Sequence, residues 1–245
     1  FPDWQAGGHG TTNVARSLAW SVNTFYYYVG GGYNGFTGLG AEKIMSWLKR
    51  LHFGTALGIE IPGELDGFVP SREWKKERTG EPWYIGDTYN LSIGQGDLLV
   101  TPLQIASLTS LVANWGTLYS PRMAEAYINA TTGERTEIAP VILQKNILSN
   151  TVLDPIRTGM RECVTYGSCR QLSSLPIEVA GKTGTAQWNA NKANHAWFTS
   201  FAPYANPEIA VTVLVEEGEE GSRTAVPVAA DFYKWWAQYR ATGQP

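Results

Sequence analysis

Two short motifs, far apart in the chain, contain residue types that could catalyse acyl transfer. Ser21-Val22-Asn23 lies near the start, and Lys182-Thr183-Gly184-Thr185 lies far downstream. Acyl transfer through a serine needs a hydroxyl activated by a base, further groups that move protons, and donors aimed at the oxyanion. In a non-helical turn, Ser21 and Asn23 can point into one cleft, where the hydroxyl relays protons and the amide holds a substrate carbonyl. Ser-x-Asn alone is a weak signal, so the second motif has to support it.

The second motif lies inside a run of residues that favours a β-strand. Alternate side chains of a strand share a face, so we expect Lys182 and Gly184 on one face and Thr183 and Thr185 on the other. Gly184 leaves room for a ligand against the strand, and an extended peptide could pair with such an edge as an additional strand. The alternative is an ordinary edge strand with a solvated lysine, which the tetrapeptide alone favours.

Helical periodicity recurs over the first two thirds of the chain. The helices that we expect are residues 11–29 with a break near 21–23, residues 40–53, residues 102 to about 113, and residues 150–164. Thr101 is the candidate N-cap of the third of these, and Pro102 its first residue. Residues 54–90 are rich in Gly, Pro and charged residues, so they predict a long looping segment.

The pattern changes to short β runs toward the C-terminus. The β elements that we expect are a hairpin with its turn at 131–134, and strands at 178–187, 195–201 and 209–215. A closing helix is expected over 226–239. This order predicts an α+β fold with an antiparallel sheet at the C-terminal end.

Composition excludes several classes of function. The 245 residues have a formal net charge of -3 and no block of Lys and Arg, so we expect no nucleic-acid partner. No apolar run is long enough to span a bilayer. Cys163 and Cys169 have no histidine cluster beside them that would suggest zinc, so we expect no metal and no cofactor. The two cysteines could form a local disulfide or remain free thiols.

Further motifs stand in a fixed order around these two. They are Phe1-Pro2-Asp3-Trp4, Gly8-His9-Gly10, Pro62-Gly63-Glu64, Gly67-Phe68-Val69-Pro70-Ser71, Gly86-Asp87-Thr88, Ser92-Ile93-Gly94-Gln95-Gly96, Thr101-Pro102-Leu103-Gln104 and His195-Ala196-Trp197-Phe198. Their order and spacing closely resemble the class B penicillin-binding proteins of the penicillin-binding protein 2, or elongation, type. The resemblance covers nearly the entire chain.

The resemblance implies a fold like that of penicillin-binding proteins and serine β-lactamases, with an antiparallel sheet, flanking helices and an all-helical lobe. It also implies a D,D-transpeptidase that cross-links peptidoglycan and binds penicillin covalently. Ser21 and Asn23 correspond to the family's middle motif and, with Lys182, are the expected catalytic residues. Thr183, Gly184 and Thr185 are the expected substrate-binding residues, and the Thr185 N–H forms half of the oxyanion hole.

The family's nucleophile motif, Ser-x-x-Lys, does not precede Ser21 in this chain. Ser46-Trp47-Leu48-Lys49 matches the pattern literally, but it follows the middle motif and belongs to the amphipathic helix over 40–53, so we expect no catalytic role for it. The chain is therefore expected to be a C-terminal part of a transpeptidase domain, inactive alone and stable only beside a complementary N-terminal segment. The alternative is a nucleophile-free pseudoenzyme that binds stem peptides or a cell-wall partner.

These expectations extend to domains, location and partners. All 245 residues would form one transpeptidase domain, with a helical lobe over about 1–176 and the sheet and closing helix over about 177–241. The resemblance places it at the outer face of the cytoplasmic membrane, anchored by a segment outside this chain. Its expected partners are stem peptides ending in D-Ala-D-Ala, β-lactams and a cell-wall synthesis complex.

Overall fold

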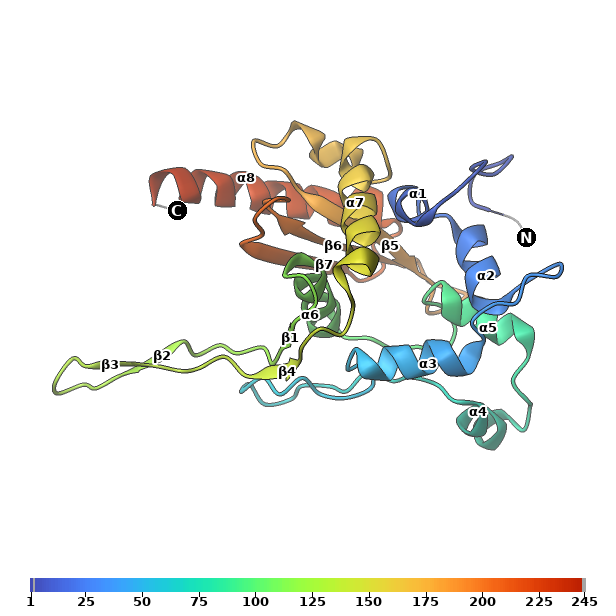
Figure 1. Ribbon diagram of the computed structural model, residues 1–245, viewed down its shortest axis with the longest axis horizontal. Coiled ribbons are helices and arrows are strands. Elements are labelled where there is room, and N and C mark those ends of the chain that lie inside the picture. Colours follow the sequence, from blue (N-terminus) through green and yellow to red (C-terminus); the bar gives the residue numbers. More distant parts are fainter. Residues whose placement is uncertain (2, 244–245) are drawn as a thin grey trace.

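A three-stranded antiparallel sheet positions the second motif. The computed structural model describes residues 1 and 3–243, so Pro2 of the first motif lies outside the described residues. The strands are β5 (Ala180–Ala186), β6 (His195–Ala202) and β7 (Ile209–Val215), in the order β5-β6-β7 (Figure 1). Lys182 stands opposite Thr199 of β6, and Thr199 stands opposite Thr212 of β7. Each of the three strands expected from the sequence is confirmed, and β5 is shorter than expected.

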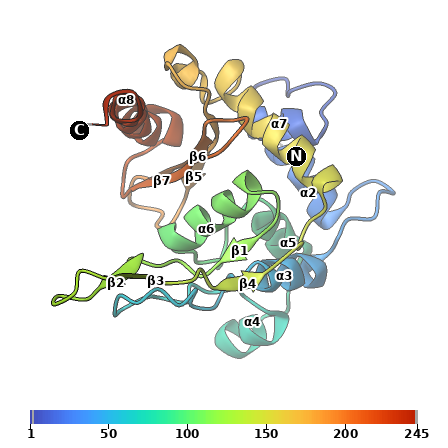
Figure 2. The same cartoon turned by 60° about the vertical axis from the view of Figure 1, so that its left-hand side comes forward.

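Helices cover both faces of this sheet. Figure 2 shows α8 (Val226–Thr242) on one side and α6 (Pro102–Ala113) on the other. Phe198 and Phe201 are three residues apart on β6, so their side chains lie on opposite faces of the sheet and enter different cores. Phe198 packs with Tyr233 of α8, whereas Phe201 packs with Leu111 of α6 and with Met160 of α7 (Asn150–Thr165). The chain is thus α+β, as the sequence predicts.

The ends of α6 follow the sequence closely. Thr101 accepts a hydrogen bond from the Gln104 backbone, the Gln104 side chain accepts one from the Thr101 N–H, and Pro102 is the first helical residue. At the other end, the buried guanidinium of Arg157 donates to the carbonyls of Val112 and Ala113. Both ends therefore have partners for backbone groups that a helix leaves unpaired.

The N-terminal helices pack against other helices of the chain. They are α1 (Val14–Trp20), α2 (Asn23–Gly31) and α3 (Ala41–Arg50), and the break expected near residues 21–23 is present. Helix α1 packs on α7, and both α2 and α3 pack on α5 (Ile85–Ser92). Met45 of α3 packs with Phe53 and Leu91, which completes a third small core. The predictions of helices over 150–164 and 226–239 are also confirmed, each within three residues of the observed ends.

The prediction of one long loop over 54–90 is wrong. This stretch contains α4 (Arg72–Thr79) and most of α5 (Ile85–Ser92). Helix α4 has no fully buried residue, and Trp74 is its single apolar side chain, so it lacks the apolar periodicity that signals a helix. Its start is fixed instead by Ser71, whose side chain accepts from the Trp74 N–H.

One long hairpin arm projects away from the sheet. The expected hairpin is confirmed, with β2 (Ala126–Ile128) paired to β3 (Arg135–Glu137), and Figure 1 shows it as a long arm. A second pair, β1 (Leu118–Tyr119) with β4 (Ile142–Gln144), lies at its base and was not expected. The short helices η1 (Arg170–Ser174) and η2 (Gly221–Ala225) were also not expected. Within the described residues, no helix is both long and apolar enough to cross a membrane.

Candidate active site

Ser21 lies at the break between α1 and α2. It ends α1 in the left-handed conformation, with φ 55° and ψ 51°. A single left-handed residue stops a helix and turns the chain sharply, and α2 then begins two residues later. This conformation is unfavourable for a residue other than glycine, so the surrounding structure has to hold it.

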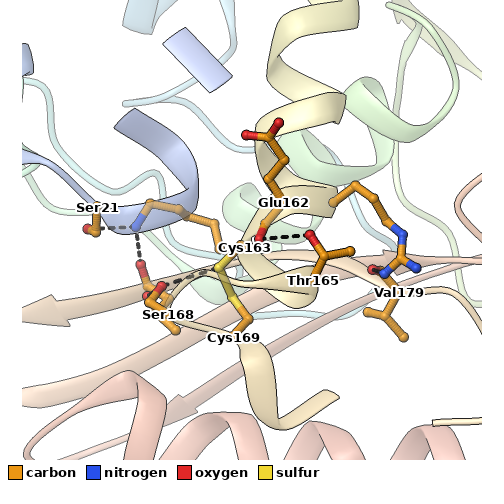
Figure 3. The surroundings of a disulfide bond; sticks show 10 residues. Ser21, Glu162, Cys163, Thr165, Ser168, Cys169 and Val179 are labelled. Atoms are coloured by element: carbon orange, nitrogen blue, oxygen red, sulfur yellow. Dashed lines mark hydrogen bonds between the residues drawn. A yellow bond between two sulfur atoms is a disulfide. The ribbon is translucent and has the colours of Figure 1, made fainter. Parts of the chain in front are cut away.

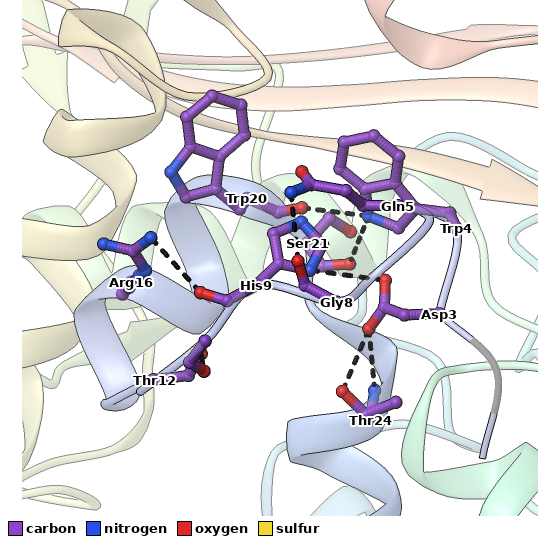
Figure 4. A network of polar contacts seen from close by, with 11 residues as sticks. Asp3, Trp4, Gln5, Gly8, His9, Thr12, Arg16, Trp20, Ser21 and Thr24 are labelled. Carbon is purple, nitrogen blue, oxygen red and sulfur yellow. Dashed lines mark hydrogen bonds and ion pairs between the residues drawn. The ribbon is translucent and has the colours of Figure 1, made fainter.

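Residues of the N-terminal segment form hydrogen bonds to both sides of this break (Figure 4). The indole N–H of Trp4 lies 3.2 Å from the carbonyl oxygens of both Trp20 and Ser21. Asp3 Oδ2 accepts hydrogen bonds from the backbone N–H and the hydroxyl of Thr24. Because the N-cap of α2 is Val22, which has no polar side chain, Asp3 supplies the missing cap and places a carboxylate at the positive end of the helix.

Lys182 joins the two motifs directly. Its Nζ donates to Ser21 Oγ at 2.8 Å and to the carbonyl of its own neighbour Thr183 at 2.5 Å. The two motifs are 161 residues apart in the chain. Burial lowers the pKa of Lys182 from 10.5 to about 8, because a low-dielectric site disfavours the charged form. The arrangement can polarise the Ser21 hydroxyl and can also move a proton near neutral pH.

Thr183 points to the opposite side of β5, as strand alternation predicts. Its hydroxyl lies 2.7 Å from Ser168 Oγ, and Ser168 Oγ lies 3.2 Å from Cys163 Sγ (Figure 3). Cys163 and Cys169 are joined in a disulfide, so of the two alternatives left open by the sequence the structure has the local bond. Ser168 was not singled out from the sequence, since one serine beside a cysteine carries no recognisable pattern.

The far end of the motif meets two other segments. Gln95 Nε2 lies 3.4 Å from the Thr185 carbonyl, and the backbone N–H of Gly221 lies 3.5 Å from the Thr185 hydroxyl. Beyond the strand, loop 187–194 lines a hollow of about 430 Å³. Gln95 belongs to a motif that supported the family resemblance, but only the fold reveals that it reaches β5.

Asn23 is near the site but is not engaged in it. It is the first residue of α2 and is partly buried. Within the described residues its side chain forms no hydrogen bond, so its amide is available to a ligand. Ser46 lies exposed on α3, and among residues 1 and 3–243 no hydrogen bond connects it to either motif.

Two of the motifs quoted from the sequence contain a histidine. The Nδ1 of His195 accepts a hydrogen bond from the Glu217 N–H. Neither ring nitrogen of His9 has a hydrogen-bond partner within the described part of the chain. The ring instead lies between the Trp4 and Trp20 rings, and its Nδ1 is 3.5 Å from Asp3 Oδ1.

The same fold occurs in known proteins. The model of the penicillin-binding protein transpeptidase domain matches residues 1–234. The chain belongs to this transpeptidase family. Within the family it is of the PBP2, or MrdA, type: it is 34% identical to the peptidoglycan D,D-transpeptidase MrdA of Haemophilus influenzae, over 98% of this chain and 38% of that protein.

Other relatives agree with this assignment. MrdA of Escherichia coli K12 is 31% identical over 90% of this chain and 36% of its own length. The crystal structure of Pseudomonas aeruginosa PBP2 superposes with a TM-score of 0.80 at 32% identity, covering 96% of this chain and 51% of that one. Helicobacter pylori PBP2, solved in complex with MreC, superposes with a TM-score of 0.79 at 32% identity, over 99% of this chain and 42% of that one. The transpeptidase chain thus spans roughly two fifths of the length of these curated relatives.

Proposed function

We propose that the protein containing this chain is a peptidoglycan D,D-transpeptidase whose nucleophilic serine lies upstream of Phe1. It would transfer an acyl group from a stem peptide ending in D-Ala-D-Ala to the amine of a neighbouring peptide. The observation that carries the proposal is the 2.8 Å hydrogen bond from Lys182 Nζ to Ser21 Oγ. It joins the two motifs that serine acyl transfer of this kind requires. The name of the MrdA relatives, peptidoglycan D,D-transpeptidase, supports it.

Each motif residue has a role in this proposal. The upstream serine attacks the carbonyl of the penultimate D-Ala, and Ser21 Oγ passes a proton toward the departing D-Ala amine. Asn23 holds a substrate carbonyl with its unengaged amide. Lys182 keeps Ser21 polarised and provides positive charge for the terminal carboxylate of the substrate.

The β5 strand has the second set of roles. Thr183 and Thr185 bind the substrate carboxylate, and Gly184 leaves space for the peptide against the strand. The Thr185 N–H forms half of the oxyanion hole, where a well-placed donor contributes strongly to the rate. The other half comes from the N–H of the nucleophile. The acceptor amine then attacks the carbonyl of the acyl-serine, forms the new amide bond, and gives up a proton to the departing serine oxygen.

We further propose that a complementary N-terminal segment completes the domain. Support comes from a hollow of about 360 Å³ between α2, α3 and α5 that is lined almost entirely by apolar side chains. Strand β7 also ends the sheet order, and all its residues are partly exposed. Uncovered apolar surface and an unpaired strand edge are unfavourable in water. We therefore expect no cooperative thermal transition for residues 1–245 alone and a cooperative one when the upstream segment is added.

Location and partners follow from the same proposal. The domain, with a helical lobe over about 1–176 and a sheet lobe over about 177–241, would lie at the outer face of the cytoplasmic membrane, anchored by a segment outside this chain. Its partners would be stem peptides, β-lactams and a cell-wall synthesis complex. The last is supported by the H. pylori PBP2 complex with MreC and by a related structure described as a peptidoglycan synthase complex.

Fluorescent penicillin tests the proposal directly. The full-length gene product, residues 1–245 alone, and a full-length Lys182→Met variant are incubated with the probe and separated under denaturing conditions. We expect covalent label on the full-length parent protein and none on residues 1–245 alone or on the Lys182→Met variant. Label on residues 1–245 alone would contradict an upstream nucleophile. Absence of label from the full-length protein, with saturable and reversible stem-peptide binding, would identify a pseudoenzyme instead.

A further inference from the structure

The turn that follows α7 connects both halves of the candidate active site. The backbone N–H of Ser168 donates to the carbonyl of Ala19 at 3.0 Å, two residues before Ser21 on α1. The hydroxyl of the same residue lies 2.7 Å from Thr183 Oγ1 on β5. One residue therefore touches the helix that carries Ser21 and the strand that carries Lys182.

The disulfide closes this turn. Cys163, in the last turn of α7, is bonded to Cys169, and both are fully buried. The Cys169 N–H also donates to the Cys163 carbonyl at 2.9 Å. Gly167 packs so closely on α1 that a Cβ there would lie 2.2 Å from the Ala19 oxygen. The turn thus has little freedom to move relative to either neighbour.

The chemistry of the three groups favours one direction for the hydrogen bond between Ser168 and Thr183. The disulfide sulfur of Cys163 has no proton, so it can only accept, and sulfur is a weak acceptor. The single proton of Ser168 can go to this sulfur or to Thr183 Oγ1, 2.7 Å away, and we take Thr183 as its partner because a hydroxyl oxygen is the better acceptor. The Thr183 hydroxyl then keeps its own proton for another acceptor. A substrate carboxylate, which can only accept, is such a group.

We propose that Ser168, held by the Cys163–Cys169 disulfide, is a positioning residue that sets the spacing between Ser21 and β5 and orients the Thr183 hydroxyl toward the substrate carboxylate. The proposal rests on the proposed transpeptidase function. Ser168 itself takes part in no chemical step. The disulfide acts through geometry, by fixing the turn from which Ser168 reaches both elements.

Acylation kinetics of the full-length protein test this role. The variants are Ser168→Ala, Ser168→Thr, which restores a hydroxyl, and Thr165→Ala, a control at the end of α7 whose hydroxyl bonds to the Glu162 carbonyl. The ligands are benzylpenicillin and its methyl ester, which lacks the carboxylate. We expect Ser168→Ala to slow acylation by benzylpenicillin about fivefold, the effect of one lost hydrogen bond. Acylation by the ester should slow by a smaller factor, because it depends on the spacing between Ser21 and β5 but not on the carboxylate contact. Ser168→Thr and Thr165→Ala should stay within about twofold of the parent protein.

Hydrogen exchange provides a second test of the positioning role that does not depend on acylation by penicillin. Peptides from β5, residues 180–186, should exchange faster in Ser168→Ala and in the Cys163→Ala/Cys169→Ala double variant, but not in Thr165→Ala. Unchanged β5 exchange in Ser168→Ala overturns the inference, whether or not penicillin binds. Equal slowing for benzylpenicillin and its ester overturns the role in orienting Thr183. A parent protein that penicillin does not acylate contradicts the proposed function, and the exchange result then decides the positioning role separately.

Discussion

The charge on Lys182 should make the domain active at the expense of its stability. Burial lowers the pKa of this group from 10.5 to about 8. At about 1.4 kcal/mol per pH unit, this difference corresponds to about 3 kcal/mol against the charged form, which partial solvent exposure of the side chain reduces to about 2 kcal/mol. We therefore expect Lys182→Met to abolish penicillin acylation while removing a destabilising charge.

The sign of the pH dependence distinguishes this effect from a change in packing. Below about pH 8 the group is charged in both the folded and the unfolded chain, so the parent protein bears the full cost. Between about 8 and 10.5 the unfolded chain still binds a proton that the folded chain has released, so the parent protein gains stability as pH rises. The stability of the variant relative to the parent should therefore fall by about 2 kcal/mol between about pH 7 and pH 10.

Urea unfolding of the full-length proteins at these two pH values measures the change. Lys192→Met is the matched control, because Lys192 is an exposed lysine of the neighbouring loop whose ion pair with Glu217 is at the surface. Its difference from the parent protein should be small at both pH values. If Lys182→Met and the parent differ in free energy of unfolding by the same amount at both pH values, the buried charge does not destabilise the fold and the reasoning fails.

Three further outcomes are expected of the full-length protein. Acylation by benzylpenicillin should decrease as pH rises through about 8, where Lys182 loses its proton, and a rate that increases over this interval would exclude a role for the lysine charge. Asn23→Ala should slow acylation about tenfold without changing the melting temperature, because its side chain forms no hydrogen bond within the described residues; parent-like kinetics would remove Asn23 from the site. Gly221→Ala should destabilise the protein by about 2 kcal/mol, since a Cβ would lie 2.2 Å from the Trp197 oxygen and 2.5 Å from the Gly184 oxygen. An unchanged unfolding curve would show that this segment can move away from β5.

The sequence determined the elements whose signals are local. Strand β7 is a continuous run of β-branched and apolar residues, and α6 has both its N-cap and its proline in place, so both were predicted to within one residue. Helix α4 was missed because Trp74 is its single apolar residue, so it has no apolar stripe. The family and its motifs were also readable, since their order along the chain is itself the signal.

Only the tertiary structure decided which residues meet. The family resemblance placed Ser21 and Lys182 in one site, but their direct contact and the lowered pKa of Lys182 depend on burial that no spacing in the sequence reveals. Asp3 capping α2, Gln95 reaching Thr185, and Ser168 bridging α1 and β5 join residues from different elements. Such pairs leave no periodic trace, because a hydrogen bond between distant segments is fixed by how the helices pack on the sheet and not by the order of residues in either segment.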